Sequence, residues 1–390
     1  MNIQQTQDIA PQNVTHYYVV NLGTLGGSAG AGNSINNAGW ASGLSKPGAG
    51  TNLHATLWIG GHAVDLGTLG GPNSGVGWPV KNTRGELVGI SDLAQTDPLN
   101  EHFCGFGSPN LCAGFEWKNY TLTPLPTLGG NNSFAAGAND SGNIAGFAET
   151  ATHDAACGAP QVLDYYATIW NANGRPRELA PENGDAISQA VSINNNGAAA
   201  GASGDCGPPN NNGFGTNHAL KWRPDGTPVD LGTLGGTLSN IGTAVNDNGD
   251  VIGQSGLPGN TAYHAFFWRH GAMTDLGTLP GDLTSEALGL NIRNQVTGYS
   301  CDVNFNCRGF ISQHGTMTDL NLLVSNSQLY IVYAGDINDR GWIVGQAVDM
   351  SNGTAPAVLL IPAQGAFTPS MRIASKIALP ESIRLQMRNN

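Results

Sequence analysis

The sequence predicts an all-β protein built from seven copies of one unit, and three observations support this prediction. Glycine contributes 56 of the 390 residues, whereas charged residues make up only 11%. A pattern Asn-x-x-Gly-x-x-x-Gly recurs at intervals of 45 to 57 residues. Six of the seven copies are accompanied by four short segments, and the last by three; four such segments are typical of the strands of one propeller blade. We therefore expect a seven-bladed β-propeller with four antiparallel strands per blade.

The repeated pattern is predicted to form the hairpin turn between the first two strands of each unit. Its last position is Gly in all seven copies, and its middle position is Gly in six, with Asn294 in the other. Asn is among the non-glycine residues that most readily adopt a positive φ. We therefore expect a positive φ at the middle position. The copies begin at Asn36, Asn82, Asn139, Asn194, Asn246, Asn291 and Asn338.

The third and fourth segments of each unit indicate how the ring closes. A third segment such as His264 to Trp268 is followed by a fourth segment of the type found at Asp230 to Gly236. The last copy lacks a fourth segment, but Tyr17 to Gly27 has that pattern without a third segment before it. Because an unpaired sheet edge invites aggregation, we expect the N-terminal strand to close the last blade.

The predicted domain boundaries follow from this repeat. They are an N-terminal extension at 1–15, the propeller at 16–362 and a C-terminal tail at 363–390. Within the tail, Ile373 to Leu379 is predicted to form a short helix that Pro380 stops. The tail either docks on the propeller or is a disordered end.

Two of the repeated strings resemble a known family. The strings are His264-Ala265-Phe266-Phe267-Trp268 and Asp230-Leu231-Gly232-Thr233-Leu234-Gly235-Gly236. They resemble the HAF-repeat family of probable extracellular proteins, over about Tyr17 to Ile361. The resemblance implies a secreted, propeller-like protein. It implies no reaction and no catalytic residues.

Composition limits the partners and the compartment. The net charge of −12 reflects a scarcity of Lys and Arg, so no basic stripe is available for nucleic acid. No apolar run approaches the roughly 20 residues of a membrane span. Met1 to Pro11 lacks the pattern of a signal peptide. Since loop cysteines suit an oxidising compartment, we expect a secreted or periplasmic protein whose signal peptide has been removed.

The six cysteines are predicted to form disulfides. Free thiols or a metal site are the alternatives, but no close Cys-x-x-Cys pair of the zinc type occurs. We therefore predict no metal and no cofactor. Fifteen connectivities are possible, and proximity along the chain favours one of them. It joins Cys104 to Cys112 and Cys301 to Cys307, so that Cys157 and Cys206 tie neighbouring blades together.

The cysteines fall in the loops between second and third strands, which we expect on the same face as the fourth-to-first connections. Long, variable loops on a rigid scaffold are where function usually lies. We expect this face to bind a carbohydrate or protein ligand, and we predict no catalytic residue. Loop Asp residues also favour turns, so a purely structural role is the alternative. The candidate ligand-binding residues are His102, His153, Asp154, Asp164, Tyr165, Asp205, Asp302 and Asp349.

Two functions are compatible with this pattern. The first is a non-catalytic extracellular binding or scaffold protein that uses the disulfide-stapled loop face. The alternative is a secreted polysaccharide-active enzyme, a lyase or hydrolase, with its site on that same face. Two carboxylates, or a His and a Tyr, converging near the axis of the face would favour the enzyme.

Overall fold

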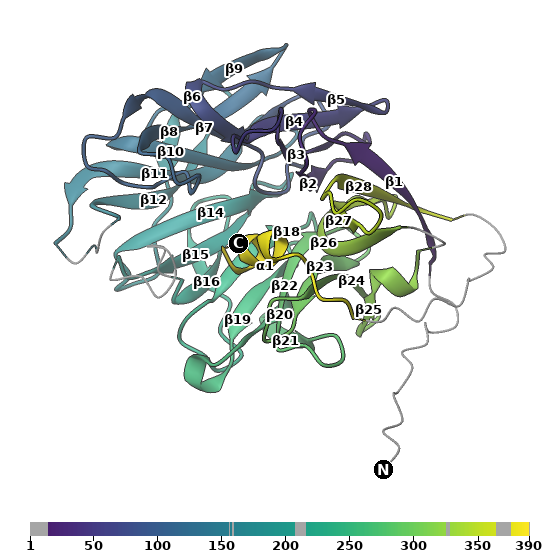
Figure 1. Cartoon of the computed structure of the whole chain (residues 1–390). Coiled ribbons are helices and arrows are strands. Elements are labelled where there is room, and N and C mark those ends of the chain that lie inside the picture. The colour runs from purple at the N-terminus through teal and green to yellow at the C-terminus, as the bar shows by residue number, and fades with distance from the viewer. Residues whose placement is uncertain are drawn as a thin grey trace.

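The computed structural model is a seven-bladed β-propeller in which each blade is a four-stranded antiparallel sheet (Figure 1). The structure describes residues 15–155, 157, 160–206, 216–324, 328–363 and 376–389. Both the blade number and the strand number match the prediction from the repeat. The N-terminal extension predicted at 1–15 lies outside the described residues except for residue 15.

The strands of each blade are given from the axis outward. Blade 1 contains β2 (Gly30–Ile35), β3 (Ala41–Ser45), β4 (His54–Ile59) and β5 (His62–Asp65); blade 2 contains β6 (Gly70–Gly75), β7 (Leu87–Thr96), β8 (Asn110–Lys118) and β9 (Thr121–Pro124); blade 3 contains β10 (Gly129–Ala138), β11 (Ile144–His153), β12 (Leu163–Trp170) and β13 (Pro176–Glu178). Blade 4 contains β14 (Ile187–Ile193), β15 (Ala199–Gly204), β16 (His218–Trp222) and β17 (Pro228–Asp230); blade 5 contains β18 (Ile241–Val245), β19 (Val251–Gly256), β20 (Tyr263–Arg269) and β21 (Ala272–Gly277); blade 6 contains β22 (Thr284–Leu290), β23 (Val296–Cys301), β24 (Cys307–Gln313) and β25 (Thr316–Asp319); blade 7 contains β26 (Leu329–Ile337), β27 (Ile343–Asp349), β28 (Ala357–Pro362) and β1 (Tyr17–Gly23). Two short 3-10 helices, η1 (Pro258–Asn260) and η2 (Leu320–Leu322), and one α-helix, α1 (Glu381–Asn389), complete the described elements.

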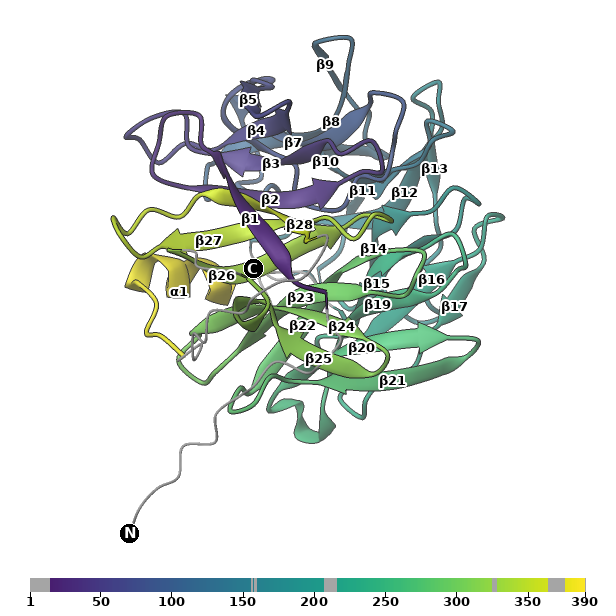
Figure 2. The same cartoon turned by 90° about the vertical axis from the view of Figure 1, so that its right-hand side faces the viewer.

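The ring closes through its first strand, as predicted. β1 pairs antiparallel with β28, with Val19 opposite Leu360, and is the outermost strand of blade 7 (Figure 2). Tyr17 is buried, and its backbone N–H donates to the carbonyl of Leu323 at the end of blade 6 (2.9 Å). The N-terminal strand therefore joins both ends of the repeat array.

The turn of each repeat has the predicted backbone conformation. The middle position has a positive φ, for example 89° at Gly39 and 59° at Asn294. The leading Asn supports the turn with its own side chain. In blade 3, Oδ1 of Asn139 accepts hydrogen bonds from the backbone N–H groups of Ser141 (3.0 Å) and Asn143 (3.1 Å).

The leading asparagines also have a role that the sequence analysis missed, because they form a closed ring. The Nδ2 group of each one donates to the backbone carbonyl of its counterpart in the next blade, at 2.8 to 3.2 Å. One residue type at one position therefore defines the turn and links adjacent blades. The ring runs through Asn36, Asn82, Asn139, Asn194, Asn246, Asn291 and Asn338.

The last glycine of the pattern is required for close packing. Six of the inner strands carry a β-bulge, as between Ala190 and Ser192 in β14. Opposite it, a Cβ atom at Gly201 would lie only 1.9 Å from the carbonyl oxygen of Gln189. The equivalent distance is 1.9 to 2.2 Å in all seven blades, so a larger residue would displace the inner strand.

The core lies between blades. Trp170 and Trp222, from equivalent third strands, are fully buried. Each indole N–H donates to a carbonyl in the connection that leads into its own blade, Pro126 for Trp170 (2.8 Å) and Ala180 for Trp222 (2.7 Å). The recurring Trp therefore combines apolar burial with a satisfied polar group.

The C-terminal tail differs from the prediction. Residues 376–379 are not helical, and 373–375 lie outside the described residues; α1 begins directly after Pro380. The carbonyl of Pro380 accepts hydrogen bonds from the N–H groups of Ile383 and Arg384. Proline fits the first turn of a helix because its missing N–H would have no partner there. Pro380 therefore starts the helix rather than ending one. Among the described residues, no helix is long and apolar enough to cross a membrane.

Candidate functional site

The propeller has two different faces. The hairpin face carries the first-to-second and third-to-fourth turns, and the loop face carries the second-to-third loops and the connections between blades. Three disulfides lie on the loop face with the predicted pairing. The Cys157–Cys206 bond joins the loop of blade 3 to that of blade 4. The others, Cys104–Cys112 and Cys301–Cys307, close loops within blades 2 and 6.

An aromatic cluster lies under the loops of blades 2 and 3. Phe147 stacks on Phe134, with ring centroids 4.7 Å apart. Phe103 packs against Phe147 (5.3 Å) and edge-on against Tyr165 (5.8 Å). Two of the disulfides belong to the same apolar cluster. The long loops therefore rest on a packed support, which favours a single loop conformation.

A buried carboxylate network connects the same two loops. Oε1 of Glu101 accepts hydrogen bonds from the backbone N–H groups of Val162 (2.8 Å) and Leu163 (2.9 Å). The Gln161 amide donates to both Glu101 (3.2 Å) and Glu149 (3.0 Å). Burial, followed by the charge of Glu101, raises the pKa of Glu149 to about 7. These acids hold the loops together from below and are closed to solvent.

Four of the predicted site residues lie in strands rather than in loops, and one of them, Asp349, ends β27. His153 ends β11, and Asp164 and Tyr165 belong to β12, because these two strands extend beyond the blade as a paired ribbon. Tyr165 is buried in the aromatic cluster. The pKa of Asp164 is raised by burial and by the charge of Asp154, and lowered by His153. The structure therefore brings His153, Asp154 and Asp164 together.

Of the other predicted residues, Asp205 directly precedes Cys206, which lies close to Asp164, whereas Asp302 and Asp349 belong to blades 6 and 7. Oδ1 of Asp302 accepts the N–H groups of Asn304 (2.8 Å) and Asn306 (2.9 Å), as a turn-forming Asp does. Asp349 supports its own turn in the same way, Asp205 accepts from Asn217 (3.1 Å), and His102 is exposed on the loop of blade 2. The structural alternative therefore describes Asp349 well, whereas Asp302 also has a charged contact, described below.

One acid–base pair lies near the axis below the loop face. The hydroxyl group of Tyr299 donates to Oε2 of Glu286 on the inner strand β22 (2.5 Å). Both side chains are buried, and burial raises the pKa of Glu286 to about 7. A substrate on the surface cannot reach this pair in the structure as it stands.

Only one group of potential metal ligands lies close together among the described residues, and it consists of Cys157, Asp164 and Cys206. The two sulfur atoms are bonded to each other. They therefore cannot act as thiolate ligands.

The C-terminal segment 376–389 binds the loop face through polar anchors at its start. Nζ of Lys376 lies 2.6 Å from a carboxylate oxygen of Asp282 and 3.2 Å from one of Asp302. The backbone N–H of Leu379 donates to Oδ1 of Asn306 (2.9 Å). At its other end, the guanidinium group of Arg388 lies over the ring of Phe305, 4.9 Å from its centroid.

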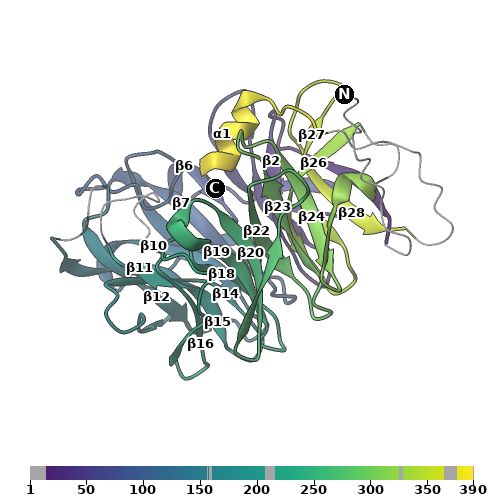
Figure 3. The same ribbon diagram turned by 90° about the horizontal axis from the view of Figure 1, so that it is seen from below.

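Between these anchors the segment buries an apolar stripe. Leu379, Ile383 and Met387, spaced four residues apart, are buried in one cluster with side chains of blades 6 and 7. Trp78 of blade 2 packs against the same cluster. Figures 1 and 3 show α1 on this face, over the middle of the ring. The spacing of the apolar residues is a sequence signal that could have located this helix.

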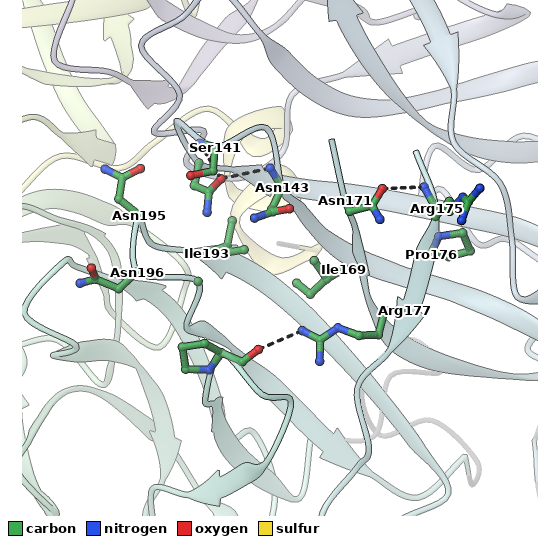
Figure 4. A pocket seen from close by; sticks show the side chains of 13 residues that line it. Ser141, Asn143, Ile169, Asn171, Arg175, Pro176, Arg177, Ile193, Asn195 and Asn196 are labelled. Atoms are coloured by element: carbon green, nitrogen blue, oxygen red, sulfur yellow. Dashed lines mark hydrogen bonds between the residues drawn. The ribbon is translucent and has the colours of Figure 1, made fainter. Parts of the chain in front are cut away.

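The hairpin face carries a groove of about 440 Å³ between blades 3 and 4, which the sequence analysis did not predict (Figure 4). Ile169 and Ile193 lie in its middle. Two arginines, Arg175 and Arg177, are among its lining residues.

The fold and the stapled loops define a β-propeller whose loop face is covered in part by its own C-terminal segment. No family model matches the chain, and no curated protein matches it. The HAF-repeat resemblance therefore stays a prediction.

Several solved structures are similar to the chain at low sequence identity. A streptogramin B lyase is 10% identical, with 89% of this chain and 98% of that chain covered and a TM-score of 0.49. A gluconolactonase from Xanthomonas campestris is 12% identical (89% and 90%, TM-score 0.37), and a puromycin hydrolase is 14% identical (85% and 53%, TM-score 0.48). Similarity at this level carries no argument about activity.

Proposed function

We propose that the protein is a binding protein that works outside the cytoplasm and binds a peptide segment of a partner at the loop face. The partner segment takes the place that residues 376–389 occupy in the structure. The observation that carries this proposal is the docking of that segment, because its contacts indicate which side chains the surface can bind.

The accepted ligand is an amphipathic helix with a basic residue before it. Apolar residues at Leu379, Ile383 and Met387 follow the i, i+4 spacing by which helices lie in apolar grooves. The carboxylates of Asp282 and Asp302 receive the cation of Lys376. A partner segment needs both features in the same order.

The covalent attachment of the segment favours its docking. The segment belongs to the same chain, so its docking is an intramolecular event with a high effective concentration. A modest intrinsic affinity is therefore enough to keep the face covered. A partner displaces the segment when its concentration relative to its Kd exceeds the effective concentration of the segment relative to its own Kd, so the face favours strong ligands.

The compartment is supported by the three disulfides. Such bonds persist in oxidising environments and are rare in the cytosol. A secreted or periplasmic location is therefore part of the proposal.

The alternative, a polysaccharide-active enzyme on the same face, rests on the proximity of His153, Asp154 and Asp164. The acids whose pKa is raised to about 7, Glu149 and Glu286, are both buried. A general acid must reach the atom that it protonates.

Fluorescence anisotropy with a labelled peptide of residues 376–389 tests the proposal. The full-length double variant Ile383→Asp/Met387→Asp releases the segment and should bind the peptide at least tenfold more tightly than the wild-type chain. Leu385, on the same helix, is 48% exposed. The control variant Leu385→Asp should therefore behave like the wild type. Equal peptide affinities for the double variant and the wild type, or equal binding of a peptide with both Asp substitutions, would contradict the proposal.

A further inference from the structure

We infer that the groove on the hairpin face between blades 3 and 4 is a second binding site, specific for an acidic sugar. This site is independent of the peptide site on the opposite face. Its size of about 440 Å³ falls within the range of about 300–1,000 Å³ of small-molecule sites.

The floor of the groove is apolar and rigid. Ile169 and Ile193 lie in the middle of the groove and belong to one buried cluster (Figure 4). Pro176 and Pro224 also line it. A flat apolar floor with polar edges suits the C–H face of a sugar ring, whose hydroxyl groups point outward.

The neighbouring blades fill the equivalent space with charged side chains. In blade 4, Lys221 takes the place of Ile169; its Nζ donates to the carbonyl of Gly249 (2.6 Å) and lies 5.2 Å from the ring centroid of Trp268. In blade 2, Glu86 takes the place of Asn143 and pairs with Lys118. Blade 3 lacks both fillers, so its groove stays open.

Two arginines give the groove a positive charge in a chain of net charge −12. Arg177 is held in place, because its Nη1 and Nη2 groups donate to the carbonyls of Asp225 and Pro224 (both 3.2 Å). An added Cβ at Gly226 would lie 2.6 Å from Nη1, so this glycine leaves room for the guanidinium group. Arg175 has no side-chain hydrogen bond or ion pair within the described part of the chain.

The chemistry of the lining selects the ligand. A guanidinium group binds a carboxylate through two parallel N–H donors. The hydroxyl group of Ser141 and the amide of Asn143 line the same groove and can bind hydroxyl groups. A sugar that carries a carboxylate satisfies both requirements at once.

Isothermal titration of the full-length protein with digalacturonic acid tests this site, with maltose as the neutral control. We expect binding of digalacturonic acid, no detectable binding of maltose, and at least a tenfold loss of affinity in Arg175→Ala/Arg177→Ala. Ile169→Lys, which reproduces the Lys221 filler of blade 4, should abolish binding. Arg84→Ala removes an exposed arginine from the hairpin turn of blade 2 on the same face and should have no effect.

Three results would overturn the inference. They are no binding of digalacturonic acid at millimolar concentration, equal losses in the Arg84 and Arg175/Arg177 variants, and acetate binding as tight as that of digalacturonic acid. Circular dichroism melts of each variant separate a lost site from a lost fold. Peptide binding at the loop face should be unchanged in all of these variants, so failure of one proposal leaves the other testable.

Discussion

The side-chain amide of Asn338 donates a hydrogen bond to the backbone carbonyl of Asn36 (3.1 Å), across the junction between the last blade and the first. The equivalent bond links each of the remaining six pairs of adjacent blades. The ring is therefore closed twice, by this bond at the hairpin face and by β1 at the outer edge of blade 7.

The asparagine ring predicts different costs for two substitutions at one position. Asn338→Ala loses the link to Asn36. It also loses two hydrogen bonds of the turn, in which Oδ1 of Asn338 accepts the N–H groups of Arg340 and Trp342. The free energy of unfolding should fall by about 2–3 kcal/mol. Asn338→Asp keeps the turn acceptors but places the oxygen of a buried carboxylate against the carbonyl oxygen of Asn36, so a larger loss of about 3 kcal/mol or more is expected. Urea unfolding measures both.

Asn171 is the matched control for this series. Its Oδ1 supports a turn through Asn173 and Arg175, but it has no counterpart in the ring. Asn171→Ala should cost no more than about 1 kcal/mol. A loss as large as that of Asn338→Ala would show that the turns, rather than the ring, carry the stability.

The two glycines of the repeat should differ in their tolerance of substitution. Gly201→Ala places a Cβ 1.9 Å from the carbonyl oxygen of Gln189 and should cost about 3 kcal/mol or more, or prevent folding. Gly197 has a φ of 84°, and Asn294 holds the equivalent position in blade 6 with a φ of 59°. Gly197→Asn should therefore cost less than about 1 kcal/mol. Thermal melts of the two variants measure both costs. Equal losses of stability would contradict the close-packing explanation.

The buried acid Glu286 should make stability depend on pH. Its pKa is raised to about 7 in the folded chain by burial, so the fold favours the protonated form. This contribution is fully present below the ordinary pKa of Glu and is lost as the pH rises through 7. Glu286→Gln, which cannot ionise, should match the wild type near pH 4 and exceed it by up to about 3 kcal/mol at pH 8.

The control for this effect is Glu178→Gln, at an exposed strand position. It should leave the pH profile of the unfolding free energy unchanged. A parallel profile for Glu286→Gln and the wild type would show that the pKa of Glu286 is the same in the folded and unfolded chains.

The disulfides should contribute unequally. Cys157–Cys206 closes a separation of 49 residues, and Cys301–Cys307 one of 6. The loop-entropy model assigns about 4 kcal/mol to the longer closure and about 2 kcal/mol to the shorter. Double Cys→Ala variants at each pair, compared by urea unfolding, should show this order. The reverse order would mean that local packing outweighs chain entropy.

The architecture could be predicted because the repeated pattern gives the number of blades and the number of strands in each blade. Asn294, as the single exception at the middle position, indicated the positive φ, and the unmatched segment beginning at Tyr17 indicated the closing strand. Hydrogen bonds between blades could not be predicted from the repeat. The ring bond from Asn338 to Asn36 depends on a distance that no repeat pattern contains.

The sequence predicted which face carries the disulfides and candidate residues, but not the contacts on it. Pairing of the cysteines followed from their spacing, but Asp164 and Tyr165, which were expected in a loop, belong to β12. The docking of residues 376–389 combines Asp282, Asn306 and Trp78 from distant parts of the chain. Only the folded ring brings these groups together.

Hydrogen exchange in the blade 6 loop, residues 301–307, tests the proposed binding surface most directly. In the full-length Ile383→Asp/Met387→Asp variant, exchange in this loop should be faster than in the wild type, since the covering segment is released. Addition of the peptide of residues 376–389 should slow it again, with no change in the hairpin turn at residues 139–143. If the peptide binds without slowing exchange in residues 301–307, the loop face is not its site.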